Sequence, residues 1–202
     1  LNTKLPQYYG ISIQLSPLFM EGTEKDIRAF YLDYFSQSYD FLDWPFSSIS
    51  EECLTDLIQL FLNAQQVSPN LSSLRQIKYT LAINLERFNK SHLIENPTPL
   101  LTSHYSTLLQ IPQFEQDIKK LAKKLNFEPK QETLEQLFSN PVKSPQIINN
   151  PSNGALGNIH HIQKSYRLLS QILEELAKEF HLQIENREEL IWLLHYTAQS
   201  DF

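Results

Sequence analysis

Residues 74–88, LRQIKYTLAINLERF, carry the clearest periodic pattern in the chain. The apolar side chains recur every three or four residues, at Leu74, Ile77, Leu81, Leu85 and Phe88. An α-helix has about 3.6 residues per turn, so this spacing places all five on one stripe that faces a core. The pattern predicts an amphipathic helix that ends before Asn96-Pro97.

Two more helices are predicted on the N-terminal side of this stretch. Thr23 and Asp26 have the spacing of a capping box, which starts a helix that runs through IRAFYLDYF and buries an aromatic side. A second box, Ser48 with Glu51, predicts a helix that starts near Ser50. Between them the bulky WPF at 44–46 is expected to plug one end of a bundle.

The pattern of the C-terminal side predicts shorter helices, a linker and two further helices. Amphipathic segments at 114–127 and 132–138 are followed by 139–158, which holds three prolines and two of the four glycines without periodicity. A heptad-like stripe then predicts a helix able to pair with a neighbour or with its own copy; its residues are Ile162, Tyr166, Leu169, Leu173, Leu176 and Phe180. A last helix, 187–199, follows a cap at Asn186 and Glu189.

These patterns predict an all-α bundle of paired amphipathic helices with a short N-terminal β segment. Strand-like alternation is convincing only at 11–20, before Gly22. The predicted divisions are a leading segment at 1–22, a first helical unit at 23–142, a linker at 143–158 and the start of a second, truncated helical unit at 159–202.

Composition and charge exclude several classes of function. A net charge of −6 has the wrong sign for gripping a phosphate backbone, so the chain is not expected to bind DNA by itself. A single cysteine, Cys53, allows neither an internal disulfide nor a CxxC zinc site, and no cofactor motif is present. No membrane-length apolar segment or signal peptide occurs, which predicts a cytoplasmic protein.

The six histidines are the most plausible reactive groups. A neutral imidazole can accept a phosphoryl group, and the added charge can reorganise a helix interface, although most helical histidines only cap, pack or face solvent. His195 ranks first because it borders the apolar stripe of the last helix. His92 and His104 are further candidates, predicted at a helix C-terminus and in a proline-bounded loop. The rings of His160 and His161 point about 100° apart in a helix and chelate a metal poorly.

Several segments together resemble the Mga family, the M protein trans-acting positive regulators of Gram-positive bacteria. The resemblance lies in GTEKDIRAFYLDYF at 22–35, WPFSSIS at 44–50, LRQIKYTLAINLERFNKSHLIENP at 74–97 and NREELIWLLHYTAQ at 186–199. It implies the PRD part of a transcription regulator, in which helical domains are phosphorylated on histidine by the phosphotransferase system. Winged-helix DNA-binding domains would precede this part, with 11–22 as their end, and a phosphocarrier-like domain would follow.

The resemblance also implies particular acceptor positions. In PRD-type domains a histidine stands seven residues before the equivalent of Arg87, where this chain has Thr80. A second expected histidine falls near Ser139, and His195 is similar to a histidine position of the second unit. The implied function is therefore a non-enzymatic regulatory domain that senses phosphotransferase status through histidine phosphorylation and controls oligomerisation. The implied partners are a second copy and the phosphocarrier protein, with DNA bound only through other domains and no membrane.

Two other interpretations stay open. A purely structural module would dimerise through 162–180 without any modified histidine, as the threonine at position 80 favours. An enzyme could assemble a site from distant residues such as Glu188, Glu189 and His195, but acids there more naturally complement a helix N-terminus.

Overall fold

The computed structural model describes residues 12–15, 18–39, 43–65, 71–101, 104–141, 159–184, 186–188, 190–191 and 193–194. Its contacts divide the chain into two compact units, 1–154 and 155–202. The predicted linker 143–158 lies outside the described residues. Among the residues described, the regular structure is seven helices, a short helical stretch near residue 190 and one short hairpin, which confirms the predicted all-α fold with an N-terminal β segment.

The N-terminal β segment is a hairpin of two strands. β1 (Ser12–Leu15) pairs with the antiparallel β2 (Leu18–Glu21), with Ser12 opposite Glu21. The sequence pattern at 11–20 indicated extended structure but not its division into two strands. Because proline cannot donate to a strand ladder, Pro17 between the strands is the signal for that division.

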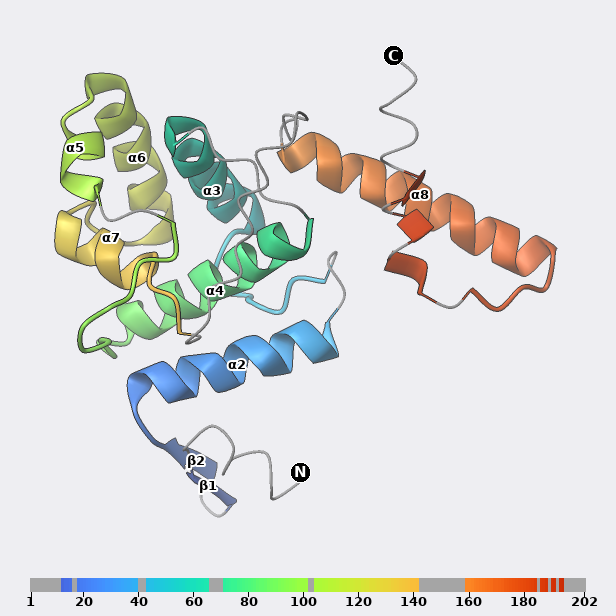
Figure 1. The fold of residues 1–202 in the computed structure, drawn as a ribbon, viewed down its shortest axis with the longest axis horizontal. Coiled ribbons are helices and arrows are strands. Elements are labelled where there is room, and N and C mark those ends of the chain that lie inside the picture. Colours follow the sequence, from blue (N-terminus) through green and yellow to red (C-terminus); the bar gives the residue numbers. More distant parts are fainter. Residues whose placement is uncertain are drawn as a thin grey trace. The chain divides into compact units, whose positions relative to one another are not determined.

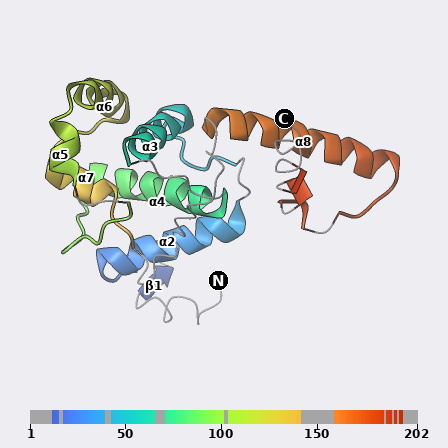
Figure 2. The same ribbon diagram turned by 45° about the horizontal axis from the view of Figure 1, so that its top comes forward.

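The described part of unit 1 has six helices, which can be followed in Figures 1 and 2. In chain order they are α2 (Glu24–Ser38), α3 (Glu51–Gln65), α4 (Leu71–Asn89), α5 (Tyr105–Leu109), α6 (Pro112–Leu125) and α7 (Gln131–Leu137). The helix predicted from 74–88 is central, because α4 packs against α2, α3 and α7, while α6 packs against α3 and α5. The short helix α5 was not predicted.

The stripe of α4 forms the core as its spacing predicts. Leu74, Ile77, Leu81 and Leu85 are buried, and Phe88 is half-buried at the end of the stripe. The facing residues are also apolar and include Leu54, Leu57, Ile58 and Phe61 of α3 and Leu134 and Leu137 of α7. Burial of this many large apolar side chains is the main force that stabilises unit 1.

Capping explains where α2 and α3 begin. The Thr23 side chain accepts a hydrogen bond from the Asp26 amide at 3.2 Å, which confirms the first predicted capping box. For α3 the cap is Ser50, whose hydroxyl accepts from the Cys53 amide at 3.3 Å. The predicted cap Ser48 was wrong: its hydroxyl instead donates to Glu86 of α4. Serine is a favoured N-cap residue at either position, and Ser50, which lacks the acid three residues on, is the one next to the first helical residue.

The WPF segment packs against the C-terminal part of α2 and the middle of α4. Phe46 is buried, with ring centroids 4.8 Å from Phe35 and 6.3 Å from Tyr79. Trp44 is half-buried and donates its indole N–H to the Ile49 carbonyl at 2.7 Å. This contact fixes the turn before α3.

Unit 2 consists, in its described part, of α8 (Ile159–Glu179) and a short helical stretch that includes Arg187 and Ile191. Ile162, Tyr166 and Leu173 of the predicted heptad stripe are buried, whereas Leu176 and Phe180 are exposed. The described part of the predicted last helix is helical, but its proposed cap partner Glu189 lies outside the described residues.

Candidate functional site: a buried arginine network

Arg28 is a fully buried cation near the start of α2. Its Nε donates to Glu24 Oε1 at 2.8 Å, one helical turn earlier. Arg87 of α4 approaches the same carboxylate from the other side, with Nε 2.9 Å from Oε1 and Nη2 2.6 Å from Oε2. One carboxylate therefore binds two guanidinium groups and connects α2 to α4.

The remaining donors of Arg28 reach three other parts of unit 1. Its Nη1 donates to Asn84 Oδ1 of α4 at 2.9 Å and to the Gln136 carbonyl of α7 at 3.5 Å. Its Nη2 donates to the carbonyl of His92, just after α4, at 2.6 Å. A buried charge is tolerated when hydrogen bonds replace its water, and these contacts do so.

Asn84 and Gln136 extend the network to the chain that follows α7. The Asn84 amide donates to the carbonyls of Leu137 and Ser139 at 2.7 and 2.8 Å. Gln136 donates to the Ile94 carbonyl at 2.9 Å and accepts from the Ile94 amide at 2.8 Å. The arginine network, meaning Glu24, Arg28, Asn84, Arg87 and Gln136, thus joins α2, α4, α7 and the segment after α4.

The charges of the network shift the pKa values of its members. Burial raises the pKa of Glu24, but the hydrogen bonds and charges of Arg87 and Arg28 outweigh it and hold that pKa below its usual value. Hydrogen bonding to Glu24 raises the pKa of Arg87. Burial lowers the pKa of Arg28 although Glu24 opposes this shift, and a guanidinium stays charged at neutral pH.

The two positions where the family resemblance implies a histidine lie beside this network. Thr80 is one turn before Asn84 on the same side of α4, and Ser139 supplies a carbonyl to Asn84. Both residues are fully buried. The Ser139 hydroxyl donates to the Gln136 carbonyl at 2.8 Å. Neither side chain is exposed to solvent, where a donor protein would bind.

His92 is exposed and lies at the end of α4, as predicted. Its amide donates to the Arg87 carbonyl at 3.0 Å, while the Ser91 amide donates to Phe88 at 2.8 Å and Ser91 has φ 63°. These are the two hydrogen bonds of a Schellman motif. The main chain of His92 is therefore fixed both by this cap and by Arg28, while its imidazole faces solvent.

The other histidines are less closely connected to the network. His104 is exposed and occupies the N-cap position of α5, without a capping hydrogen bond from its side chain. His195, the candidate ranked first from the sequence, lies outside the described residues, as does Glu189 of the alternative enzymatic site. His181 has φ 52° and lies in the turn that ends α8, where the Leu182 amide donates a hydrogen bond to the Ala177 carbonyl. The role of His181 is therefore structural.

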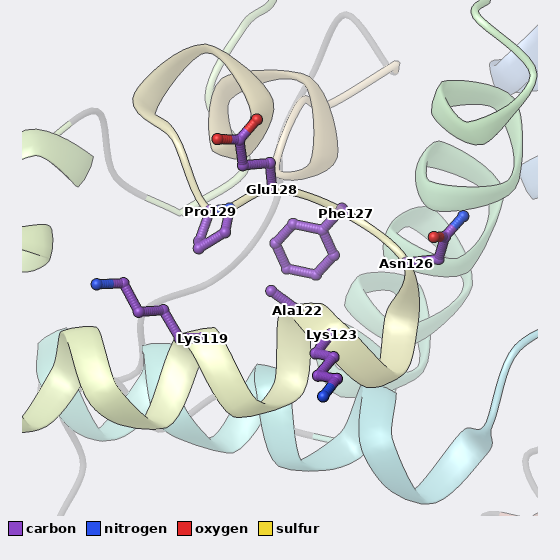
Figure 3. A pocket seen from close by; sticks show the side chains of 7 residues that line it. All are labelled: Lys119, Ala122, Lys123, Asn126, Phe127, Glu128 and Pro129. Carbon is purple, nitrogen blue, oxygen red and sulfur yellow. The ribbon is translucent and has the colours of Figure 1, made fainter.

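An open pocket lies where α6 turns toward α7 (Figure 3). Its lining residues are Lys119, Ala122, Lys123, Asn126, Phe127, Glu128 and Pro129. Lys119 already pairs with Glu115 at 2.5 Å. The carbonyl end of α6, which carries partial negative charge, borders the pocket, so the lysines there do not make a strong anion site.

Within the described part of the chain, no cluster of histidine, cysteine or acidic side chains could hold a metal ion. The described helices also include none that is long and apolar enough to cross a membrane.

Sequence reasoning missed the arginine network. The available signal is Asn84, a polar residue between the apolar residues of LAINL in the most regular helix. Arg28 gave no comparable signal, because arginines on an amphipathic helix usually point to solvent. Only the tertiary structure shows that the side of α2 that carries Arg28 faces α4.

Glu24→Gln provides the first test of the network. A carboxylate with a depressed pKa contributes stability above its unfolded pKa, near 4.5, and loses it as the pH falls through the folded value. We expect Glu24→Gln to lower the free energy of unfolding by about 1–3 kcal/mol at pH 7. The difference should shrink below pH 4.5 in urea titrations of both proteins. A difference that does not change with pH would contradict the assigned role of this carboxylate.

A comparison with known protein families gives one match. A family model described as the M protein trans-acting positive regulator (MGA) PRD domain matches residues 50–200. This range includes α3 to α8 and most of the arginine network.

Individual relatives are regulators from two bacteria. A putative trans-acting regulator of Streptococcus pneumoniae is 29% identical over 200 residues, which are 98% of this chain and 41% of the relative. The capsule synthesis positive regulator AcpA of Bacillus anthracis is 19% identical over 98% of this chain and 42% of its own length. The anthrax toxin expression trans-acting positive regulator of the same organism is 29% identical over 50% of this chain and 22% of the relative. The chain thus spans less than half the length of these regulators.

Proposed function

Because the chain belongs to the family of Mga PRD domains, we propose that it is the signal-receiving part of a positive transcription regulator. The observation that carries the proposal is the match to the family model over residues 50–200. The relatives compared above are all named as regulators, which agrees with the proposal. DNA would be bound by other domains of the protein, since this chain has a net charge of −6.

The proposed signal is phosphorylation of histidine by the phosphocarrier protein of the phosphotransferase system, which reports carbohydrate status. Candidate acceptors are His195, His92 and His104. Exposure of His92 and His104 supports access by a donor protein. Of these two, His92 is the better supported acceptor, because its carbonyl accepts a hydrogen bond from Arg28 of the network. The main chain of His104 does not belong to the network.

The phosphoryl group would pass from the donor's phosphohistidine to an imidazole nitrogen of the acceptor, which releases its proton while the donor imidazole recovers one. At His92 it would bring a charge of about −1.5 to −2 to the exposed end of α4, on the residue whose carbonyl accepts from Arg28. Such a group would compete with Glu24 for Arg87, which is the partly exposed cation of the network. Glu24 is the first residue of α2, which follows the β hairpin, so phosphorylation would change how firmly the preceding chain is held. We further propose that this change alters association between two copies of the protein.

The test is phosphoryl transfer from phosphoenolpyruvate through the general phosphotransferase proteins, followed by intact mass. The wild-type chain is compared with His92→Ala, His104→Ala and His195→Ala, and with His161→Ala as an exposed control. We expect one phosphoryl group per chain, lost in one of the three variants and retained in the control. No incorporation, with the donor proteins shown to be active, would contradict the proposal.

The alternative is a helical interaction module that is not phosphorylated. The specific observation in its favour is the full burial of Thr80 and Ser139, where PRD-type acceptors are expected. The phosphorylation test separates the two functions, since this module would incorporate nothing and still associate.

A further inference from the structure

Unit 2 carries a continuous exposed apolar face. Six of the nine exposed large apolar side chains in the described residues belong to this unit, although it is much the smaller of the two. Leu168, Ile172 and Leu176 of α8 are 58%, 42% and 40% exposed, and Phe180 just after the helix is 61% exposed. They are spaced four residues apart, so they form one stripe along the helix, here called the Ile172 stripe.

The rest of the described unit 2 leaves this stripe uncovered. Arg187 fixes the following segment on α8 by donating to the Ser170 carbonyl at 2.9 Å and to Glu174 Oε1 at 2.7 Å. Residues two positions apart in a helix differ by about 200° in direction. Ser170 and Glu174 therefore lie on roughly the opposite side of α8 from Ile172.

The charges of α8 are divided along its length. Its N-terminal half, 159–169, contains Lys164 and Arg167 and no acid, whereas 170–179 contains three glutamates and one lysine. Glu179 in the last turn lies at the end of the helix dipole that disfavours a carboxylate. This distribution of charge destabilises an isolated α8, because it is unfavourable to the helix dipole. In an antiparallel pair of two α8 helices, however, the basic half of each helix lies beside the acidic half of the other.

We propose that α8 pairs antiparallel with α8 of a second copy through the Ile172 stripe. With the two-fold axis at Ile172, Leu168 of one copy meets Leu176 of the other, and Lys164 lies beside Glu179 of the second copy. The helix dipoles are also opposed in this arrangement. A parallel pair would instead place Lys164 against Lys164 and Glu179 against Glu179. The inference specifies the association surface of the proposed function and so rests on it.

The first experiment is sedimentation of the 202-residue chain over a concentration series, with Ile172→Glu as the test variant and Leu93→Glu as the control. Leu93 is similarly exposed, at 55%, but lies in unit 1. We expect a wild-type dimer whose Kd rises at least about tenfold in Ile172→Glu, where two carboxylates meet at the axis, and is unchanged in Leu93→Glu. Circular dichroism checks that each variant is folded. A dimer unaffected by Ile172→Glu would overturn the proposal.

A charge exchange tests the direction of pairing without touching the apolar face. Lys164→Glu and Glu179→Lys should each weaken the dimer, while the double variant should restore it, because each cation again meets an anion of the other copy. Two weakening substitutions that add up in the double variant would exclude the antiparallel pair. A wild-type chain that stays monomeric would overturn the inference. The Ile172 stripe would then be covered by unit 1 or by another protein. Phosphoryl incorporation would be unaffected, so the two proposals fail separately.

Discussion

Arg28→Met should lower the free energy of unfolding of unit 1 by about 3–5 kcal/mol, the range expected when one member of a buried ionic network is removed. Arg28 is fully buried and donates to Glu24, Asn84 and the carbonyls of His92 and Gln136. Methionine fills a similar volume, so the loss reports the missing donors rather than a cavity. The acceptors left in the interior carry most of the penalty.

Urea unfolding followed by Trp44 fluorescence measures this change. Trp44 lies in unit 1 and the second tryptophan, Trp192, lies in unit 2, so a Trp192→Phe background isolates the signal. Arg167→Met is the matched control, since Arg167 is exposed on α8 and should change stability by less than about 0.5 kcal/mol. Equal effects of the two substitutions would show that the network contributes no stability of its own.

The helical architecture was predictable because it depends on periodicity. The α4 stripe from Leu74 to Leu85 is buried as its spacing requires, and the Thr23 box marks the start of α2. Patterns with several equivalent solutions were less informative. Ser48 and Ser50 are both residues that can cap a helix, and α5 is too short for its five residues to show a period.

The arginine network was not predictable for a different reason. Helical periodicity locates a side chain on its own helix, but the partners of Arg28 come from α4, α7 and the chain after α4. Which helix faces which is a property of the tertiary fold. The family resemblance implies histidine acceptors at the positions of Thr80 and Ser139. In the structure both residues are fully buried near Asn84, and Asn84 donates to the Ser139 carbonyl.

Phe61→Ala should have an effect similar in size to that of Arg28→Met, but in the aromatic cluster that α3 shares with α5, α6 and α7. The Phe61 ring is fully buried in α3, with centroids 4.1 Å from Phe138, 5.1 Å from Phe114 and 6.1 Å from Tyr105. These rings come from α5, α6 and the end of α7. Truncation removes the shared contact and leaves a cavity, for which about 3–5 kcal/mol is expected.

The same urea measurement, with amide hydrogen exchange, distinguishes local from global effects. Phe61→Leu keeps most of the apolar volume and should lose less stability, and Tyr34→Ala is a control at a 48% exposed aromatic position. If Phe61 anchors the C-terminal helices of unit 1, exchange in α5 and α6 should accelerate more than exchange in α2. Uniform acceleration would instead mean that the aromatic cluster and the arginine network unfold together. In that case, loosening Glu24 at the start of α2 would also weaken α5 and α6, and a signal at His92 would reach the whole of unit 1 rather than α2 alone.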